Sequence, residues 1–167
     1  MQLGGLLTEY GDLDESDNDA VEAALFLQTL MDKNLQGWVY WYASALPAAS
    51  STIRKILSRP YARRIAGTPL AMSFDHQSHE FHLEFRPNIF AQPQETEIFF
   101  DGASKPYSNG VRCEIVPEDS AECSVMPLNN TVVVKTIFVE STQSTISIKL
   151  GPNNNNLRQI MVQQTDN

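Results

Sequence analysis

Glu9 and Trp41 are the residues of this sequence whose types and positions best suit chemistry on a sugar. Glu9 follows an apolar run over residues 4–7, and Trp41 lies in an aromatic run over residues 37–42. A carboxylate at the end of a buried strand can attack or stabilise an anomeric carbon. An indole offers a flat apolar face on which a sugar ring can rest. Together they predict a carbohydrate site, if their two segments lie side by side.

One helix-length stretch separates these two segments. Six residues recur at helical spacing and predict a stripe that faces a core: Ala20, Ala23, Ala24, Leu27, Leu30 and Met31. A second, short helix is predicted from Ser51 or Thr52 to Leu57, because Pro60 limits its extension. Residues 1–68 therefore read as strand, helix, strand, helix, and this alternation predicts a parallel sheet.

From residue 69 onward the apolar period changes from helical to alternating. Short strands are predicted where apolar residues alternate with polar neighbours, around Met72, Phe74, Phe81, Leu83, Phe85, Ile98, Phe100, Val111, Cys113, Ile115, Val132, Val134, Ile146, Ile148 and Leu150. Turn-forming pairs such as Asn109-Gly110 and Asn129-Asn130 separate them. This density of strands and turns predicts an antiparallel β-sandwich over residues 69–150. The Asn-rich residues 151–167 are expected to be partly disordered.

Two further features of the strand-rich half indicate the cellular compartment in which the protein is found. Cys113 and Cys123 could form a disulfide between neighbouring strands, and two free buried cysteines are the alternative. Asn129, Asn130 and Thr131 form an N-glycosylation acceptor sequence, which makes Asn129 a candidate modification site. Taken together, these features favour a secreted or lysosomal protein. A basic region followed by an apolar segment, as in a signal peptide, is not observed at the start of the sequence.

Composition narrows the classes of partner. The net charge of −8 argues against nucleic acid, whose phosphates need basic patches. No apolar run approaches the roughly 20 residues of a transmembrane helix. His76, His79 and His82 are the only histidines. Two of them flank a predicted turn while the third alternates with core residues on a strand, so no metal site is expected.

Four blocks of the sequence, in order, resemble the endoglycoceramidases of glycoside hydrolase family 5. The blocks are Leu6-Leu7-Thr8-Glu9-Tyr10-Gly11, then Trp38-Val39-Tyr40-Trp41, then Arg59-Pro60-Tyr61 with Ile65-Ala66-Gly67-Thr68, and Ser73-Phe74-Asp75 leading to Phe81-His82-Leu83. The first block alone is weak evidence for the resemblance, whereas four blocks in order at compatible spacing are specific evidence. The similarity extends from residue 1 to about residue 150 and implies an α/β plus all-β chain. Its first 68 residues would be the last quarter of a TIM (β/α)8 barrel, followed by the β-sandwich.

The resemblance implies a role for each candidate residue. Glu9 matches the catalytic nucleophile that ends barrel strand 7, although Tyr10 replaces the Phe that is commoner in the family. Trp41 matches the sugar platform that ends strand 8. Trp38 lies on the other face of that strand and is expected to pack internally. The implied substrate is a glycolipid, either a glycosphingolipid or a related glucosylceramide or steryl glucoside, and the implied reaction needs no cofactor.

Half of the catalytic pair has no counterpart in the sequence. Retaining hydrolysis uses two carboxyl groups about 5–5.5 Å apart. In the family the acid/base lies in an Asn-Glu block, and this sequence contains no Asn-Glu pair. A TIM barrel also takes about 250 residues. The chain is therefore expected to be a fragment without activity of its own. Two alternatives are a separate carbohydrate- or lipid-binding sandwich module and an incomplete gene model.

Overall fold

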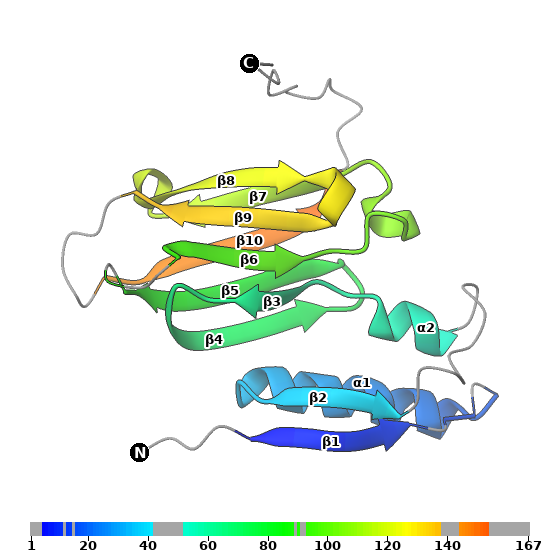
Figure 1. Cartoon of the computed structure of the whole chain (residues 1–167). Helices are drawn as coiled ribbons and strands as arrows, with labels where there is room; N and C mark the ends of the chain where they lie inside the picture. Colours follow the sequence, from blue (N-terminus) through cyan, green and yellow to red (C-terminus); the bar gives the residue numbers. More distant parts are fainter. Residues whose placement is uncertain are drawn as a thin grey trace.

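The protein has two parts, a small strand–helix–strand unit and a larger β-sandwich (Figure 1). The structure is a computed structural model that describes residues 5–11, 13–14, 16–41, 52–88, 90, 93–137 and 144–153. The expectation of disorder in the tail falls mostly on residues 154–167, which lie outside the described residues. Within the described chain, no helix has the length and apolar character that crossing a membrane would require.

The first part contains two parallel strands joined by a helix. Strands β1 (Leu6–Gly11) and β2 (Gly37–Trp41) pair in parallel, as the order of elements predicts. Helix α1 (Asn18–Lys33) connects them. It begins where the Asp17 side chain accepts a hydrogen bond from the backbone N–H of Asp19, 2.9 Å away. This cap satisfies one of the donors that a helix leaves unpaired at its start.

The buried stripe of α1 differs from the predicted one. Ala24 and Met31 are buried as expected, but Ala23 and Leu30 are exposed. Gln28 and Asp32 are buried in their place. Hydrophobic periodicity cannot identify this face, because its polar members are stabilised by partners that come from other elements. Those partners are Tyr10 and Arg59.

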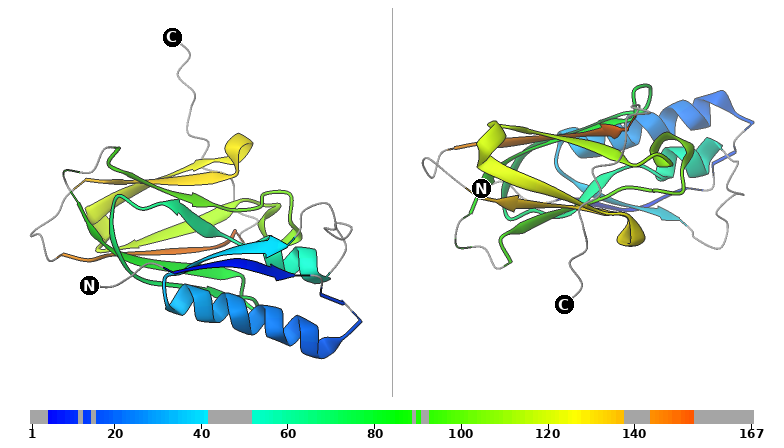
Figure 2. Two further views of the ribbon diagram at one scale, coloured as in Figure 1. Left: turned by 60° about the horizontal axis from the view of Figure 1, so that its bottom comes forward. Right: turned by 90° about the horizontal axis from the view of Figure 1, so that it is seen from above.

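The second part consists of two four-stranded antiparallel sheets packed face to face (Figures 1 and 2). The first sheet has the order β4 (Gly67–Asp75), β5 (Glu80–Pro87), β10 (Ile146–Pro152) and β7 (Val111–Val116). The second has the order β3 (Tyr61–Arg64), β6 (Glu95–Phe99), β9 (Thr131–Thr136) and β8 (Ala121–Met126). The predicted antiparallel sandwich is confirmed.

The sandwich core follows the predicted alternation. Fully buried side chains of the first sheet meet those of the second, and they include Phe81, Leu83, Phe85, Ile146, Ile148, Leu150, Ile98, Val132 and Val134. Each such side chain contributes about 1.5–3 kcal/mol relative to leaving it in water. The sandwich core is thus built mainly from the strands of its own two sheets.

Two strands of the second sheet were not predicted. Strand β3 has only four residues, two of them arginines, and the apolar residues that alternate in β8 are the small side chains Ala121, Cys123 and Val125, so neither strand has a strong hydrophobic signal. Both are recognised only through pairing, β3 with β6 and β8 with β9. Because β3 belongs to the sandwich sheet, the sandwich begins before the boundary at residue 68 that the sequence suggests. Strand β10 likewise extends to Pro152, beyond the predicted end at residue 150.

Helix α2 (Thr52–Leu57) forms over the predicted residues, and it lies between the two parts. Ile53 and Ile56 on this helix are buried, and the chain then passes through Arg59 and Pro60 into β3. Figure 2 shows α2 beside the β1–β2 pair, near the point where the chain enters the sandwich.

Candidate functional site

Glu9 and Trp41 lie at the same end of the parallel pair. Gly11, the last residue of β1, is the register partner of Trp41, and Tyr10 is the partner of Tyr40. Glu9 therefore precedes the paired strand end by two residues. The carboxyl ends of parallel strands form the edge at which active sites of α/β proteins are built. The topology brings the two candidate residues to one rim.

The backbone around Glu9 is irregular. The register between β1 and β2 shifts between Leu7 and Tyr10, so that Thr8 and Glu9 lie in a bulge, and both side chains are exposed. Bulges occur often beside active sites because they re-aim a side chain without ending the strand. The sequence shows no sign of this bulge.

Gly11 allows the two strand ends to approach closely. A Cβ atom at this position would overlap the carbonyl oxygen of Trp41. Only glycine fits against that backbone. The close approach of the Glu9 and Trp41 segments therefore requires a residue without a side chain at position 11.

The two faces of the strand pair have different surroundings. Trp38, Tyr40, Leu7 and Tyr10 are at least partly buried on the side covered by α1. On the other face, Leu6 is 61% exposed, Val39 48% and Trp41 53%. Trp41 thus presents much of its indole to solvent, whereas Trp38 packs inside, as the alternation of β2 predicts.

Tyr10 supports the rim from the side of the helix. Its ring meets Trp38 and Tyr40 edge to face, with centroids 5.6 and 5.4 Å away. Its hydroxyl accepts a hydrogen bond from the Gln28 side chain at 3.1 Å. Burial raises the pKa of the Tyr10 hydroxyl above its ordinary value. The departure from Phe at this position is accommodated because α1 provides a partner for the extra hydroxyl.

A buried ion pair lies behind Trp38. Arg59 donates to Asp32 through both terminal nitrogens, with Nη2 2.6 Å from Oδ1. The guanidinium also lies over the rings of Trp38 and Phe74, 5.7 and 5.8 Å from their centroids. The sequence analysis does not predict this pair. The position of Asp32 next to Met31, on the buried side of the predicted helix, could have indicated a buried partner of opposite charge.

The three histidines take separate positions. His76 contacts the Phe74 ring, and burial, followed by the nearby Arg59 charge, lowers its pKa to about 4. His79 lies in the β4–β5 turn with a positive φ of 57°. His82 shares a hydrogen bond with the Ser147 hydroxyl at 2.8 Å. Among the described residues, no group of three or more His, Cys, Asp or Glu side chains could hold a metal ion.

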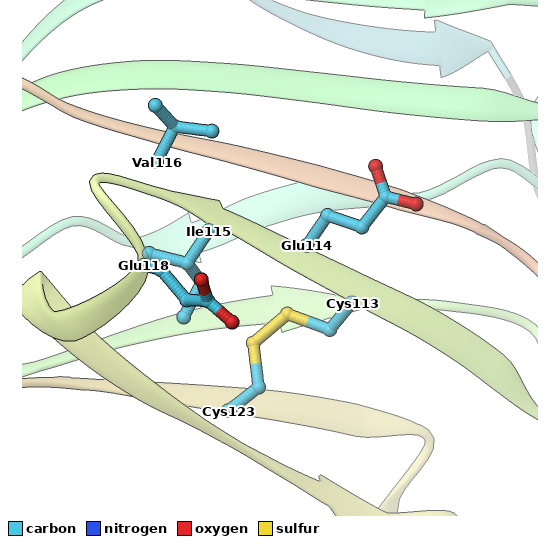
Figure 3. Close-up of a pocket in the computed structure, with 6 residues that line it drawn as sticks. All are labelled: Cys113, Glu114, Ile115, Val116, Glu118 and Cys123. Carbon is cyan, nitrogen blue, oxygen red and sulfur yellow. A yellow bond between two sulfur atoms is a disulfide. The ribbon is translucent and has the colours of Figure 1, made fainter.

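Cys113 and Cys123 are joined by a disulfide in the structure (Figure 3). Their Cα atoms are 6.5 Å apart, within the usual range for a disulfide. Cys113 belongs to β7 and Cys123 to β8, which are edge strands of different sheets. The bond therefore links the two layers at one open edge, beside a shallow hollow that Glu114 and Glu118 also line.

Asn129 is exposed at the end of a 3₁₀ turn, Pro127–Asn129. Asn130 follows in the left-handed conformation with a φ of 50°. Thr131 is buried and donates its hydroxyl hydrogen bond to the Asn129 carbonyl at 2.9 Å. The asparagine side chain is thus accessible, while the threonine belongs to the start of β9.

Comparison with known proteins identifies relatives of this fold. Residues 59–149 match the model of the glycoside hydrolase family 5 C-terminal domain. The solved structure of endo-glycoceramidase II from Rhodococcus sp. is similar with a TM-score of 0.67 and 22% identity, over 90% of this chain and 33% of that one. Cryptococcus neoformans sterylglucosidase 1 is similar with a TM-score of 0.66 and 13% identity, over 82% of this chain and 24% of that one. No curated protein matches the sequence.

The lengths covered differ between the chain and these relatives. This chain spans about a third of the endo-glycoceramidase chain and about a quarter of the sterylglucosidase chain. The structural likeness also covers more of this chain than residues 59–149, which the family model matches. At sequence identities of 22% and 13%, the structural similarity shows a shared fold alone.

Proposed function

The chain belongs to glycoside hydrolase family 5, and on that premise we propose that it is part of a retaining glycosidase whose substrate is a glycolipid. In this proposal residues 1–68 form the last two strand–helix units of a TIM barrel, and the sandwich packs against them. The bond cleaved joins a sugar to a ceramide, as in a glycosphingolipid, or to the lipid of a glucosylceramide or steryl glucoside. The single observation that carries the proposal is the shared rim of Glu9 and Trp41.

Glu9 acts as the nucleophile in this proposal. Its carboxylate attacks the anomeric carbon, the bond to the lipid oxygen breaks, and a glycosyl-enzyme ester forms. A second carboxyl group protonates the leaving oxygen and then activates the water that hydrolyses the ester. The sequence has no Asn-Glu pair to provide it, so we assign the acid/base to a segment outside these 167 residues.

Trp41 acts as the sugar platform. Its indole is half exposed on the face of β2 opposite to α1, at the end of the strand. The same face includes Val39 and Leu6, which are unusually exposed for a parallel sheet. Parallel strands are normally covered on both faces. In this proposal the exposed face of β1 and β2 is covered by further structure and forms part of a barrel interior.

The choice of a lipid glycoside follows from the relatives. The names of the two similar structures specify a glycoceramidase and a sterylglucosidase, which act on sugars linked to lipids. A shared fold does not fix a substrate, because function depends on the site that the fold presents. We therefore propose the substrate class and leave the choice of glycolipid to experiment.

The alternative function is a non-catalytic carbohydrate- or lipid-binding module. It is favoured by the buried core of the sandwich, which, among the residues that the structure describes, includes no side chain from the strand–helix–strand unit. On this hypothesis the chain binds glycolipid without a contribution from Glu9.

We also propose that the protein folds in the secretory pathway or functions in a lysosome. The Cys113–Cys123 disulfide and the exposed Asn129 support this proposal, because disulfides persist in oxidising compartments. Mass spectrometry of protein purified from a eukaryotic secretory host would test both features. A free thiol at either cysteine together with unmodified Asn129 would contradict it.

The decisive experiment joins these residues to a complete family 5 barrel that contains an Asn-Glu acid/base block. Glu9→Gln in that protein should reduce turnover of a fluorescent glycosylceramide by at least about 10³-fold without changing the melting temperature. A 2-fluoro-sugar inactivator should form a covalent ester on Glu9, identified by peptide mass spectrometry. Glu22→Gln, at an exposed position on α1, is the matched control and should retain activity.

The outcomes separate the two functions. Label on another carboxylate, or full activity in Glu9→Gln, would contradict the nucleophile role. Glycolipid binding by the 167-residue chain that Glu9→Gln and Trp41→Ala leave unchanged would favour the binding module. Turnover by the 167-residue chain alone would contradict the assignment of the acid/base to another segment.

A further inference from the structure

A cleft of about 720 Å³ lies where the strand–helix–strand unit meets the sandwich. Its lining comes from α1, α2, the end of β4, the β4–β5 turn and the segment 101–107, which includes a 3₁₀ turn at Lys105–Tyr107. Figure 1 shows α2 and the start of α1 at the end of the molecule where β1 and β2 terminate. The cleft is formed only when both parts of the protein are present.

The floor of the cleft is apolar. Val21 and Leu25 come from the first half of α1, Phe74 from β4 and Pro106 from the 3₁₀ turn. Tyr107 adds its buried ring, and its hydroxyl donates a hydrogen bond to the His79 carbonyl at 2.6 Å. The hydroxyl of Tyr107 is therefore already used within the protein. An apolar lining of this extent suits a hydrocarbon group.

The rim of the cleft is cationic. Lys55 and Lys105 are both exposed, and neither has an ion-pair partner within the part of the chain that the structure describes. Arg54 also lines the cleft, and Asp101 is the one acidic residue in its lining. A cleft lined by three basic residues and a single acidic one is unusual in a chain with a net charge of −8.

Three basic residues on the sandwich surface are paired instead with carboxylates. Arg64 pairs with Glu97 at 2.9 Å, Arg112 with Glu114 at 2.9 Å, and Lys149 with Glu80 at 2.9 Å. These three cations are neutralised by neighbouring carboxylates, whereas the ammonium groups of Lys55 and Lys105, unpaired within the described chain, lie beside an apolar wall. Positive charge beside a low-dielectric wall attracts anions more strongly than the same charge on an open surface.

We propose that this cleft binds an anionic amphiphile, with its phosphate, sulfate or carboxylate group at Lys55 and Lys105 and its hydrocarbon chain on Val21, Leu25 and Phe74. The site is distinct from Glu9 and Trp41 and does not depend on the proposed glycosidase activity. Its ligand carries a negative charge on the polar end, whereas the ceramide glycosides and steryl glucosides considered above are recognised through neutral sugars.

The test uses n-decyl phosphate below its micelle concentration with the full chain at low micromolar concentration. Lysine acetylation by acetic anhydride, quantified by peptide mass spectrometry, reports each ammonium group separately. Decyl phosphate should slow the acetylation of Lys55 and Lys105 at least about threefold. Lys33 and Lys135, which are exposed and lie outside the cleft, are internal controls and should react at unchanged rates.

Calorimetric titration then separates the contributions of charge and tail. We expect inorganic phosphate and decanol each to bind at least about tenfold more weakly than decyl phosphate, and decyl sulfate and decanoate to bind within about tenfold of it. Lys55→Glu and Lys105→Glu should each weaken binding about tenfold, and Lys33→Glu less than twofold. If a charge reversal lowers the melting temperature, Lys55→Gln and Lys105→Gln take its place, with a smaller loss expected.

Three results would overturn the proposal. Equal protection of all four lysines would indicate non-specific detergent binding. Equal affinity for decanol and decyl phosphate would remove the role of the lysines. Equal affinity for inorganic phosphate and decyl phosphate would remove the role of the apolar floor.

Discussion

Arg59 and Asp32, separated by 27 residues in the sequence, form a bidentate ion pair in which each side chain is only 2% exposed. Asp32 lies in the last turn of α1, and Arg59 lies just before β3. Because Arg59 also contacts the rings of Trp38 and Phe74, one guanidinium connects the strand–helix–strand unit with the sandwich. The orientation of one part on the other therefore depends on a buried charge pair.

Removing one member of this pair should destabilise the protein strongly. Asp32→Ala leaves the Arg59 charge buried without compensation, and such changes typically cost about 3–5 kcal/mol. Urea unfolding followed by circular dichroism measures the free energy of unfolding. Asp32→Leu combined with Arg59→Met removes both charges and should cost clearly less than Asp32→Ala alone.

Arg112→Gln is the matched control for this prediction. Arg112 pairs with Glu80 and Glu114 on the surface, so its loss should cost no more than about 1 kcal/mol. Equal effects of Asp32→Ala and Arg112→Gln would contradict the role assigned to the buried pair.

Gly11→Ala should disturb the rim that carries Glu9 and Trp41. The new methyl group would overlap the Trp41 carbonyl oxygen, which belongs to the backbone and cannot rotate away. We expect a loss of about 1–3 kcal/mol and a shift in tryptophan fluorescence. Gly37→Ala is the control, because a Cβ there meets only the flexible end of the Leu6 side chain. Similar stability of the two variants would argue against close packing at Gly11.

His76 should make the protein less stable as the solution becomes more acidic. Its pKa is lowered from 6.5 to about 4 in the folded state, first by burial and then by the Arg59 charge. The unfolded chain therefore binds more protons between these values, and stability falls as pH decreases from about 6.5 to 4. The expected loss in the free energy of unfolding is about 1 kcal/mol. It is smaller than the full pKa shift implies because His76 is partly exposed and solvent screens its interactions.

Chemical denaturation of His76→Gln at pH 7 and at pH 4.5 measures this effect. The variant should lose less stability than the parent over this interval, while carboxylates titrate equally in both. His82→Gln, on the sandwich surface beside Ser147, should behave like the parent. A pH dependence that His76→Gln leaves unchanged would contradict the prediction.

Reduction of the Cys113–Cys123 disulfide should lower stability without abolishing the fold. The bond closes a loop with a sequence separation of 10, and a loop of this size contributes about 2–3 kcal/mol by restricting the unfolded chain. Thermal unfolding with and without a phosphine reductant tests this effect. The double variant Cys113→Ser, Cys123→Ser should melt like the reduced parent, and a further decrease on reductant addition would contradict this account.

Features that depend on the order of residues within one segment could be predicted from the sequence alone. Apolar alternation at Phe81, Leu83 and Phe85 predicts a buried strand because successive side chains of a strand point to opposite faces. One helix between the segments of Glu9 and Trp41 predicts a parallel pair with both residues at one end, which the register of β1 and β2 confirms.

Features that depend on a residue far away in the sequence became apparent only in the folded protein. Strands β3 and β8 have few large apolar side chains and become strands through pairing with β6 and β9. Asp32 is buried where Arg59 pairs with it, and the buried Gln28 side chain donates a hydrogen bond from its amide nitrogen to the Tyr10 hydroxyl. The cationic cleft exists because helices and sandwich loops meet there. Periodicity records how apolar residues are spaced along one element, whereas the burial of a polar group is stabilised only by the particular atom that the fold brings to it.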